Sequence, residues 1–304
     1  MVSNTFKGFV YGAVAAASYG LNPLFTLPLY SDGISADSVL FYRYGLGVVM
    51  LALLMKIQKQ SFVLHRSEIL PLFVMGMLFA FSSLTLFLSY NYMDAGIAST
   101  ILFVYPVLVA IIMAVCFKEK VSVITALSIA LAFLGISLLY KGEGGKTLNL
   151  VGVLLVFASS LTYAVYIIGV NRSSLKDMPT SKLTFYALLF GLSVFVVRLK
   201  FCTQLDIITT PALWVNPIAL ALFPTVISLI AMTKSIHYIG STPAAILGAL
   251  EPITALFFGV LVFGERLTPR IILGIILVLT AVTLIIIGKS LMNTIRVHIL
   301  RSNK

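Results

Sequence analysis

Long apolar runs separated by short polar segments make up most of this 304-residue chain. Each run holds about 18 to 23 residues, and about 20 apolar residues in a helix span the hydrocarbon core of a bilayer. The runs are continuous and do not alternate with a period of two, which disfavours a transmembrane barrel. The pattern predicts an all-α membrane protein with ten transmembrane helices. Their approximate limits are Phe9–Leu29, Asp37–Met55, Ile69–Tyr90, Ala95–Phe117, Val121–Tyr140, Leu150–Gly169, Ser181–Leu199, Pro217–Ser235, Thr242–Phe263 and Ile271–Gly288.

The composition agrees with this prediction. Hydrophobic residues make up 60% of the chain and charged residues 10%, whereas an average soluble domain is about 25% charged. So few charges exclude an ordinary soluble enzyme, and such hydrophobicity excludes disorder. The net charge of +11 comes from basic residues in the short loops. It therefore indicates orientation in a membrane, and no nucleic-acid partner is expected.

The distribution of basic residues predicts which ends of the helices face the cytoplasm. If the N-terminus is inside, the inner segments hold 14 Lys and Arg residues and the outer loops hold 6, while Arg43 lies within a span. Positive charge favours the cytoplasmic side. We therefore expect a multi-pass protein of the plasma (inner) membrane with both termini cytoplasmic. Cys116 would then lie near the inner face and Cys202 near the outer face, too far apart for a disulfide.

The two halves of the chain resemble each other. A shift of 146 positions places Tyr92, Pro106 and Glu119 on Tyr238, Pro252 and Glu265, and a shift of 144 aligns the earlier part. Each half has five expected spans, an odd number, so the second would enter the membrane inverted, as in many secondary transporters. The predicted domains are a first five-helix repeat at 1–142, a second inverted repeat at 149–289, and a basic cytoplasmic tail at 290–304.

At these motifs the sequence resembles a known family. Leu250-Glu251-Pro252-Ile253 with Gly264-Glu265-Arg266-Leu267-Thr268 looks like the second repeat of an EamA-type carrier of the drug/metabolite transporter superfamily, and Val104-Tyr105-Pro106-Val107 looks like the weaker first copy. Arg43 matches the arginine that this family tends to have in its second helix. The family often has Trp early in the first helix, where this chain has Tyr19 and then Asn22.

This resemblance implies secondary transport. We expect a carrier that moves a small metabolite, an amino acid or similar, in the direction of export across the plasma membrane by alternating access. The alternative is a channel or facilitator for small polar solutes without ion coupling. The sequence contains no nucleophile–base pattern and no HExxH motif, so no enzyme and no metal site are expected. No cofactor is expected, although proton coupling stays open; the partners are a small-molecule substrate and the lipid bilayer, and the protein would be a monomer or a homodimer.

Two charged residues inside the spans are the first candidates for the site. Glu251 lies about halfway along the ninth span, where an ionised carboxylate is costly unless it faces the interior. It could bind a substrate amine or carry a proton; a structural carboxylate is the alternative. Arg43 could bind a substrate carboxylate through a bidentate pair, or it could pair with Glu251.

Aromatic residues and prolines complete the candidate site. Tyr105, Tyr163 and Tyr166, with Tyr19 and Asn22 on the first span, are expected to line a cavity at the midplane. Hydroxyl residues at helical spacing mark further possible cavity faces, although interhelical packing explains them just as well. They are Ser159, Ser160 and Thr162 on the sixth span, Ser82, Ser83, Thr85 and Ser89 on the third, and Thr225 and Ser228 on the eighth. Prolines lack the N–H that bonds to the carbonyl four residues earlier, so they break helices and free carbonyls. The expected breaks are at Pro23, Pro106, Pro224 and Pro252, which would free the carbonyls of Tyr19, Leu102, Leu220 and Gly248.

Overall fold

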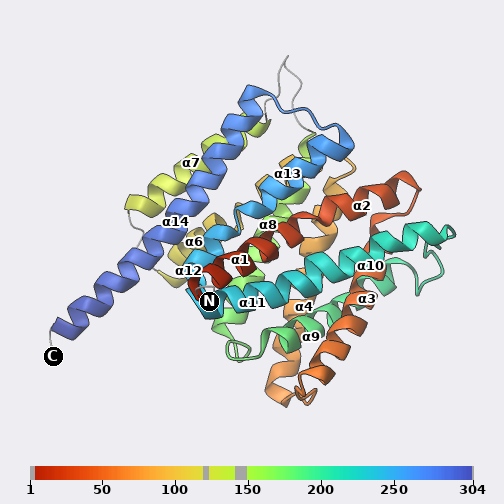
Figure 1. Ribbon diagram of the computed structural model, residues 1–304, viewed down its shortest axis with the longest axis horizontal. Helices are drawn as coiled ribbons and strands as arrows, with labels where there is room; N and C mark the ends of the chain where they lie inside the picture. The colour runs from red at the N-terminus through yellow and green to blue at the C-terminus, as the bar shows by residue number, and fades with distance from the viewer. Residues whose placement is uncertain (1–3, 119–122, 141–148, 303–304) are drawn as a thin grey trace.

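The computed structural model describes residues 4–118, 123–140 and 149–302, except for the side chains of 140, 241–242 and 288–302. Glu119, which the repeat aligns with Glu265, thus lies outside the described residues. The elements, shown in Figure 1, are α1 (Asn4–Gly20), α2 (Asn22–Ser31), α3 (Ala36–Ile57), α4 (Arg66–Ser89), α5 (Ala95–Leu102), α6 (Tyr105–Phe117), α7 (Val123–Tyr140), α8 (Leu150–Arg172), α9 (Thr180–Arg198), η2 (Pro211–Trp214), α10 (Val215–Ala221), the π-helical η3 (Leu222–Ile227), α11 (Ser228–Ile239), α12 (Ser241–Leu247), α13 (Leu250–Phe263) and α14 (Pro269–Ser302).

The prediction of an all-helical membrane protein is confirmed. The described residues contain no strand, and eight helical stretches are long and apolar enough to cross a membrane. They are Ala36–Ile57, Arg66–Ser89, Ala95–Phe117, Leu150–Arg172, Thr180–Arg198, Pro211–Ile239, Pro243–Phe263 and Pro269–Ile287. Each matches one of the expected runs, with ends that differ by a few residues.

The other two expected spans have a different form. The chain leaves helical structure at Leu21 and divides Phe9–Leu29 between α1 and α2. The apolar part of α7, Val123–Leu139, is shorter than the eight spans, and residues 119–122 before it are not described. The count of ten transmembrane helices therefore stays a prediction. The expected tail at 290–304 continues α14 as a helix to Ser302.

Local sequence explains where several helices begin. The Ser35 side chain accepts a hydrogen bond from the Ser38 N–H at 3.4 Å, and Asn149 accepts one from Val151 N–H at 2.9 Å. At α4 the Glu68 carboxylate accepts from the His65 N–H at 2.8 Å. Each of these side chains accepts a hydrogen bond from a backbone N–H at the start of a helix, which has no partner within the helix.

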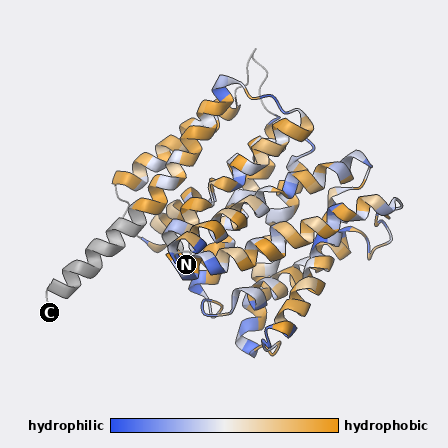
Figure 2. Ribbon diagram, in the orientation of Figure 1, coloured by the Kyte–Doolittle hydropathy of each residue, from blue (hydrophilic) through white to orange (hydrophobic). Residues whose placement is uncertain are grey.

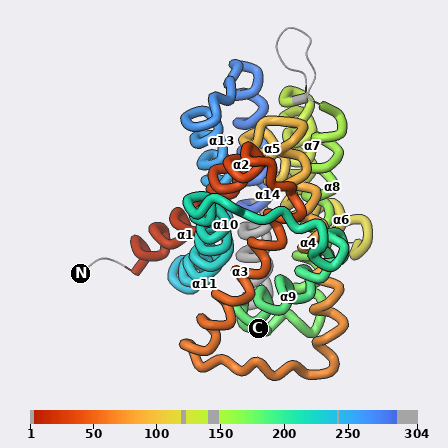
Figure 3. The backbone as a smooth tube through the Cα atoms, turned by 90° about the vertical axis from the view of Figure 1, so that its right-hand side faces the viewer, coloured from red at the N-terminus to blue at the C-terminus, as the bar shows by residue number. Residues whose placement is uncertain are grey.

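The helices pair mostly across the two halves of the sequence. α1 packs along α11, α3 along α9, α4 along α8 and α7 along α14, so each pair joins a helix before residue 142 to one after residue 149 (Figures 1 and 3). Small residues allow close approach. A Cβ atom on Gly135 of α7 would lie 2.8 Å from the Gly274 carbonyl oxygen of α14.

The outside of the bundle is apolar along the helices, and polar residues gather toward their ends (Figure 2). Large hydrophobic side chains are exposed on several helices, among them Leu70, Val115 and Leu261. A soluble monomer rarely exposes so much contiguous apolar surface, whereas a lipid-facing protein requires it.

Connections between helices define two ends of the bundle. One end carries the connections 32–35, 199–210 and 264–268, and we name it the Asp206 end. The end named the Ser174 end carries the connections 58–65 and 173–179, which approach each other where the Ser174 hydroxyl donates to the Ser67 carbonyl oxygen at 3.3 Å.

Candidate functional site

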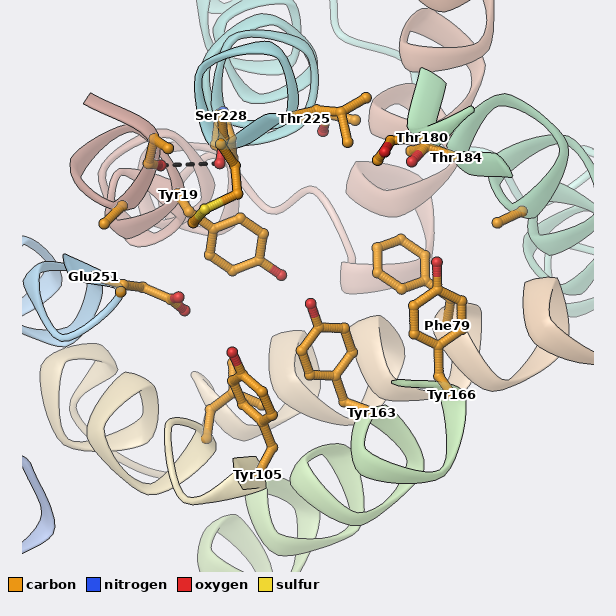
Figure 4. A pocket seen from close by; sticks show the side chains of 18 of the residues that line it. Tyr19, Phe79, Tyr105, Tyr163, Tyr166, Thr180, Thr184, Thr225, Ser228 and Glu251 are labelled. Atoms are coloured by element: carbon orange, nitrogen blue, oxygen red, sulfur yellow. Dashed lines mark hydrogen bonds between the residues drawn. The ribbon is translucent and has the colours of Figure 1, made fainter. Parts of the chain in front are cut away.

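A cavity of about 280 Å³ lies among α1, α3, α4, α5, α6, α8, α9, η3, α11, α12 and α13. Both halves of the sequence line it. Six of the seven predicted binding residues line it: Arg43 and, labelled in Figure 4, Tyr19, Tyr105, Tyr163, Tyr166 and Glu251. The tertiary structure thus brings together residues that are up to 232 positions apart in the sequence.

Glu251 is the second residue of α13, and its carboxylate points into the cavity (Figure 4). Within the described part of the chain, this carboxylate accepts no hydrogen bond and forms no ion pair. The backbone on its other side is tightly packed, since a Cβ atom on Gly20 would lie 2.7 Å from the Thr254 side chain and closer still to the Glu251 carbonyl oxygen. The backbone of α13 at Glu251 is therefore tightly packed against α1, whereas the Glu251 carboxylate faces the cavity.

The small residues beside Glu251 differ from those that a continuous helix would place there. Helical spacing predicts Ala244, Gly248, Thr254 and Ala255 on its face. The structure places Ala245 and Gly248 in the cavity wall and buries Ala244 and Ala255 completely. The cause is the break between α12 and α13, where Gly248 N–H bonds to the Ala245 carbonyl, three residues back instead of four, at 3.1 Å. This tighter turn rotates α12 relative to α13.

Four tyrosines form the polar part of the wall. The rings of Tyr105 and Tyr163 meet edge to face with centroids 4.8 Å apart, and Tyr163 stacks on Tyr166 at 5.8 Å. Phe79 lies 5.4 Å from Tyr166 and extends the row. In Figure 4 the hydroxyls of Tyr19, Tyr105 and Tyr163 point toward the centre. The hydroxyls of Tyr105, Tyr163 and Tyr166 have no partner among the described residues, so they are free to bind a ligand or water.

Arg43 lies on α3 and is only 3% exposed. Its Nε donates a long hydrogen bond of 3.5 Å to the Thr225 hydroxyl, and its guanidinium lies 5.4 Å from the centre of the Phe87 ring. The described structure contains no ion pair between Arg43 and Glu251, so the pairing that the sequence left open is not formed. A guanidinium has five donors; besides Thr225, the Tyr19 hydroxyl is a hydrogen-bond partner of this group, and Arg43 lines the cavity.

Asn22 is the predicted binding residue that does not line the cavity. It is 3% exposed, and its amide nitrogen donates to the Tyr19 carbonyl oxygen at 2.8 Å. That carbonyl loses its helical partner because Pro23 and the turn at Leu21 interrupt the helix. The prediction that Asn22 contacts substrate is therefore not supported, because its side chain repairs the helix break.

Regular helix ends or changes at or just before each of the four predicted prolines. Pro23, Pro106 and Pro252 lie in the first turns of α2, α6 and α13, and Pro224 lies in the π-helical η3. Only Pro224 also touches the cavity.

The carbonyls at these breaks are not free, contrary to the expectation from sequence. Besides Tyr19, the Leu102 carbonyl accepts from the Ser160 hydroxyl at 3.1 Å. The Leu220 carbonyl accepts from Thr225 at 3.4 Å, and the Gly248 carbonyl from the Glu251 N–H at 2.9 Å. Away from water, an unpaired carbonyl is costly, so nearby donors satisfy it. The ligand-binding groups of the cavity are consequently side chains.

The remaining polar lining comes from hydroxyl residues. Of the three expected hydroxyl faces, only that of Thr225 and Ser228 lines the cavity, and the Ser228 hydroxyl donates to the Ala15 carbonyl at 2.9 Å (Figure 4). The Ser82 and Ser159 hydroxyls instead bond to each other's carbonyl oxygens between α4 and α8, at 3.0 and 2.7 Å. Sequence reasoning missed Thr180 and Thr184 on α9. Their four-residue spacing, which places both on one helical face, was the available signal.

The cavity extends toward the Ser174 end. Thr180, the first residue of α9, is exposed and still belongs to its lining, as does the exposed Ala245 of α12. On the other side the lining stops at Tyr19, Arg43 and Tyr105.

A hydrogen-bond network around the Asp206 carboxylate joins the two halves of the chain at the Asp206 end. The carboxylate accepts hydrogen bonds from the Ser35 N–H at 2.9 Å, the Ser35 hydroxyl at 2.5 Å and the Ser38 hydroxyl at 2.9 Å. These hydrogen bonds, led by that of the Ser35 hydroxyl, hold the pKa of Asp206 below its ordinary value. Nearby, Arg198 and Asp37 form an ion pair with an Nε–Oδ1 distance of 2.5 Å. All these contacts join the first half of the chain to the second.

The apolar helices and the internal polar cavity are those of a multi-pass membrane protein. The family model of the EamA-like transporter family matches residues 6–141 and 150–287. The chain therefore belongs to the EamA-like transporter family. This confirms the resemblance noted in the sequence.

Individual relatives are more distant. An uncharacterized transporter of Synechocystis sp. is 28% identical over 205 residues, which are 66% of this chain and 61% of the relative. An uncharacterized transporter of Archaeoglobus fulgidus is 26% identical over 189 residues, 62% of this chain and 66% of the relative. The chain thus spans slightly less than two thirds of either relative. A crystal structure of a protein with 16% identity has a TM-score of 0.64 over 91% of this chain and 95% of its own, which shows a shared fold.

Proposed function

We propose that the protein is a secondary transporter that exports a small metabolite carrying both an amine and a carboxylate, such as an amino acid, by alternating access. The observation that carries this proposal is that Glu251 and Arg43 line one cavity without pairing with each other. An ammonium group would bind at Glu251 and a carboxylate at Arg43. Both buried charges would then be compensated, as the low-dielectric interior requires.

The size and lining of the cavity support a small zwitterion. Pockets for drug-sized ligands measure about 300–1,000 Å³, and this one measures about 280 Å³. One guanidinium and one carboxylate offer no surplus of positive charge for a phosphorylated substrate. The row of Tyr105, Tyr163 and Tyr166 supplies apolar ring surface with hydroxyls for the rest of the molecule.

Alternating access would follow from two inverted five-helix halves, in keeping with the two segments that match one family model. In the described conformation the cavity reaches the Ser174 end, while the Asp206 network joins the two halves of the chain at the other end. With both termini cytoplasmic in the plasma membrane, this conformation would be open to the cytoplasm. It is the state that an exporter presents to its substrate. The proposal includes assembly as a monomer or a homodimer and leaves proton coupling open.

The test is counterflow into proteoliposomes that contain the purified protein and a trapped pool of unlabelled amino acids. We expect saturable, stereoselective uptake of at least one labelled amino acid, inhibited by its unlabelled form. Flux that does not saturate and does not distinguish enantiomers would indicate the facilitator or channel instead. Absence of counterflow for every amino acid would overturn the substrate class.

The proposed topology predicts how the two native cysteines react. Both are free and exposed, Cys202 in the connection after α9 and Cys116 near the end of α6. We expect a membrane-impermeant maleimide to label intact cells at Cys202, and a Cys202→Ser variant to lose that label. In a background without native cysteines, Ser174→Cys should react only in inside-out vesicles. Labelling of Ser174→Cys from outside would reverse the topology.

A further inference from the structure

Glu265 lies in the connection between α13 and α14, outside the cavity and outside the apolar spans. Its carboxylate accepts hydrogen bonds from the Ala95 N–H at 2.8 Å and from the Gly96 N–H at 3.2 and 3.3 Å. These amides open α5, so a carboxylate from the second half of the chain occupies the N-terminus of a helix in the first half. The unpaired amides and the helix dipole favour negative charge there.

The backbone around Glu265 leaves room for its carboxylate and for little else. A Cβ atom on Gly96 would lie 2.7 Å from Glu265 Oε2 and 2.8 Å from the Leu256 side chain, and a Cβ atom on Gly259 would overlap the same carboxylate. Gly264 adopts a φ of +69°, a left-handed conformation open to glycine, and turns the chain back toward α5. The Glu265 N–H then bonds to the Gly259 carbonyl oxygen at 3.0 Å.

This contact joins the two helices that lead to the candidate substrate site. α5 runs from the Glu265 contact to the break before Tyr105, and α13 runs from Glu251 to the turn before Glu265. The two helices pack along each other (Figure 3). Opening the cavity toward the Asp206 end would require their far ends to separate, because both flank the cavity's closed side.

We propose that Glu265 is the latch of a gate at the Asp206 end: it closes the gate by binding the amides of Ala95 and Gly96, and it leaves them whenever the cavity opens to that side. The proposal rests on the alternating-access part of the proposed function. It assigns Glu265 to gating, whereas Glu251 belongs to substrate binding.

The latch should respond to pH. Burial, and then the neighbouring Asp94, raise the pKa of Glu265 to about 7 in the closed state, against the opposing effect of the Gly96 and Ala95 amides. Arg266 and Arg270, on the same connection and the first turn of α14, form no ion pair with it in the described structure. When released into water, the carboxyl group returns to its ordinary pKa of 4.5. The closed state therefore holds the proton more tightly, so closure is favoured at acid pH and is lost as the pH rises through about 7.

The test measures the distance between the connection that precedes α5 and the connection that follows α13. Spin labels on Asn91→Cys and Leu267→Cys, two exposed positions beside the latch, would be measured in lipid nanodiscs on a protein without its native cysteines. We expect one short distance at about pH 6 and a severalfold larger population of a longer distance at about pH 8. Glu265→Gln, which keeps the size and accepts the amide bonds without charge, should stay closed at both pH values. Glu265→Ala should show the longer distance at both.

The matched control is Glu68→Gln, because Glu68 also accepts a backbone N–H at a helix start, at the opposite end of the bundle. It should keep the wild-type pH response. A pH response that persists in Glu265→Gln, or wild-type distances in Glu265→Ala, would overturn the latch. Because the readout is a distance and not a flux, this result is independent of whether the proposed substrate is transported.

Discussion

Glu251→Gln is expected to reach the membrane in normal amounts and to lose most of its transport. The glutamine keeps the shape and hydrogen bonding of Glu251 but cannot compensate a substrate ammonium in the cavity. A hydrogen bond to a charged group contributes about 1.5–3 kcal/mol, so the loss should be about tenfold to a hundredfold at about 1.4 kcal/mol per tenfold. The measurement is initial counterflow rate in proteoliposomes at matched protein content. If protons are coupled, the remaining flux should also lose its pH dependence.

Glu68→Gln serves as the control, since Glu68 is distant from the cavity lining. Wild-type transport by Glu251→Gln across roughly pH 5.5 to 8 would make Glu251 a structural residue. The site would then be an uncharged cavity whose binding groups are the hydroxyls and rings of Tyr105, Tyr163 and Tyr166.

The Arg43→Lys variant is expected to transport a zwitterionic substrate at least about tenfold more slowly than the wild type, while its abundance in the membrane stays near normal. The guanidinium now contacts the Phe87 ring and the Thr225 hydroxyl at once. A lysine ammonium is a compact point charge, and it cannot keep both contacts and also hold a carboxylate in a bidentate pair. Arg43→Ala should lower abundance as well, because it leaves a gap at a buried site.

Comparing two substrates that differ only in the carboxylate separates the role of Arg43 from that of Glu251. Arg43→Lys should impair an amino acid more than its decarboxylated amine, because only the amino acid has a group for Arg43. Arg198→Lys is the matched control: Arg198 is exposed and pairs with Asp37 near the surface, where an ion pair contributes about 0–1 kcal/mol. Wild-type flux in Arg43→Lys would refute the prediction, and low abundance of both Arg43 variants would favour a structural role.

Properties set by contiguous residues were readable from the sequence. Runs of about 20 apolar residues must form helices in lipid, because each backbone N–H and C=O needs a partner within its own segment. Eight of the expected runs are accordingly helices of spanning length. Proline carries its effect in its own ring, so Pro23, Pro106, Pro224 and Pro252 marked irregular helix positions without any knowledge of packing.

Properties that depend on neighbours from distant segments were not readable in this way. The helix break at Gly248 rotates α12 and exchanges Ala244 for Ala245 in the cavity wall, and Asn22 turns to the Tyr19 carbonyl instead of the cavity. The proline-freed carbonyls found donors that no local pattern specifies, such as Ser160 for Leu102. A side chain's partner depends on distances between helices, and these are set by the packing of the whole bundle.

The sequence by itself determined the helical membrane architecture, the family and the charged and aromatic residues from which a site could be made, because hydrophobicity, charge and proline geometry act over a few neighbouring positions. Only the tertiary structure decided that Arg43 and Glu251 share a cavity without pairing, that this cavity extends toward the Ser174 end, and that Glu265 binds the first amides of α5. The physical reason is that each of these facts is a short distance between residues far apart in the chain. Such distances are specified by which helices pack together, and no single segment encodes that choice.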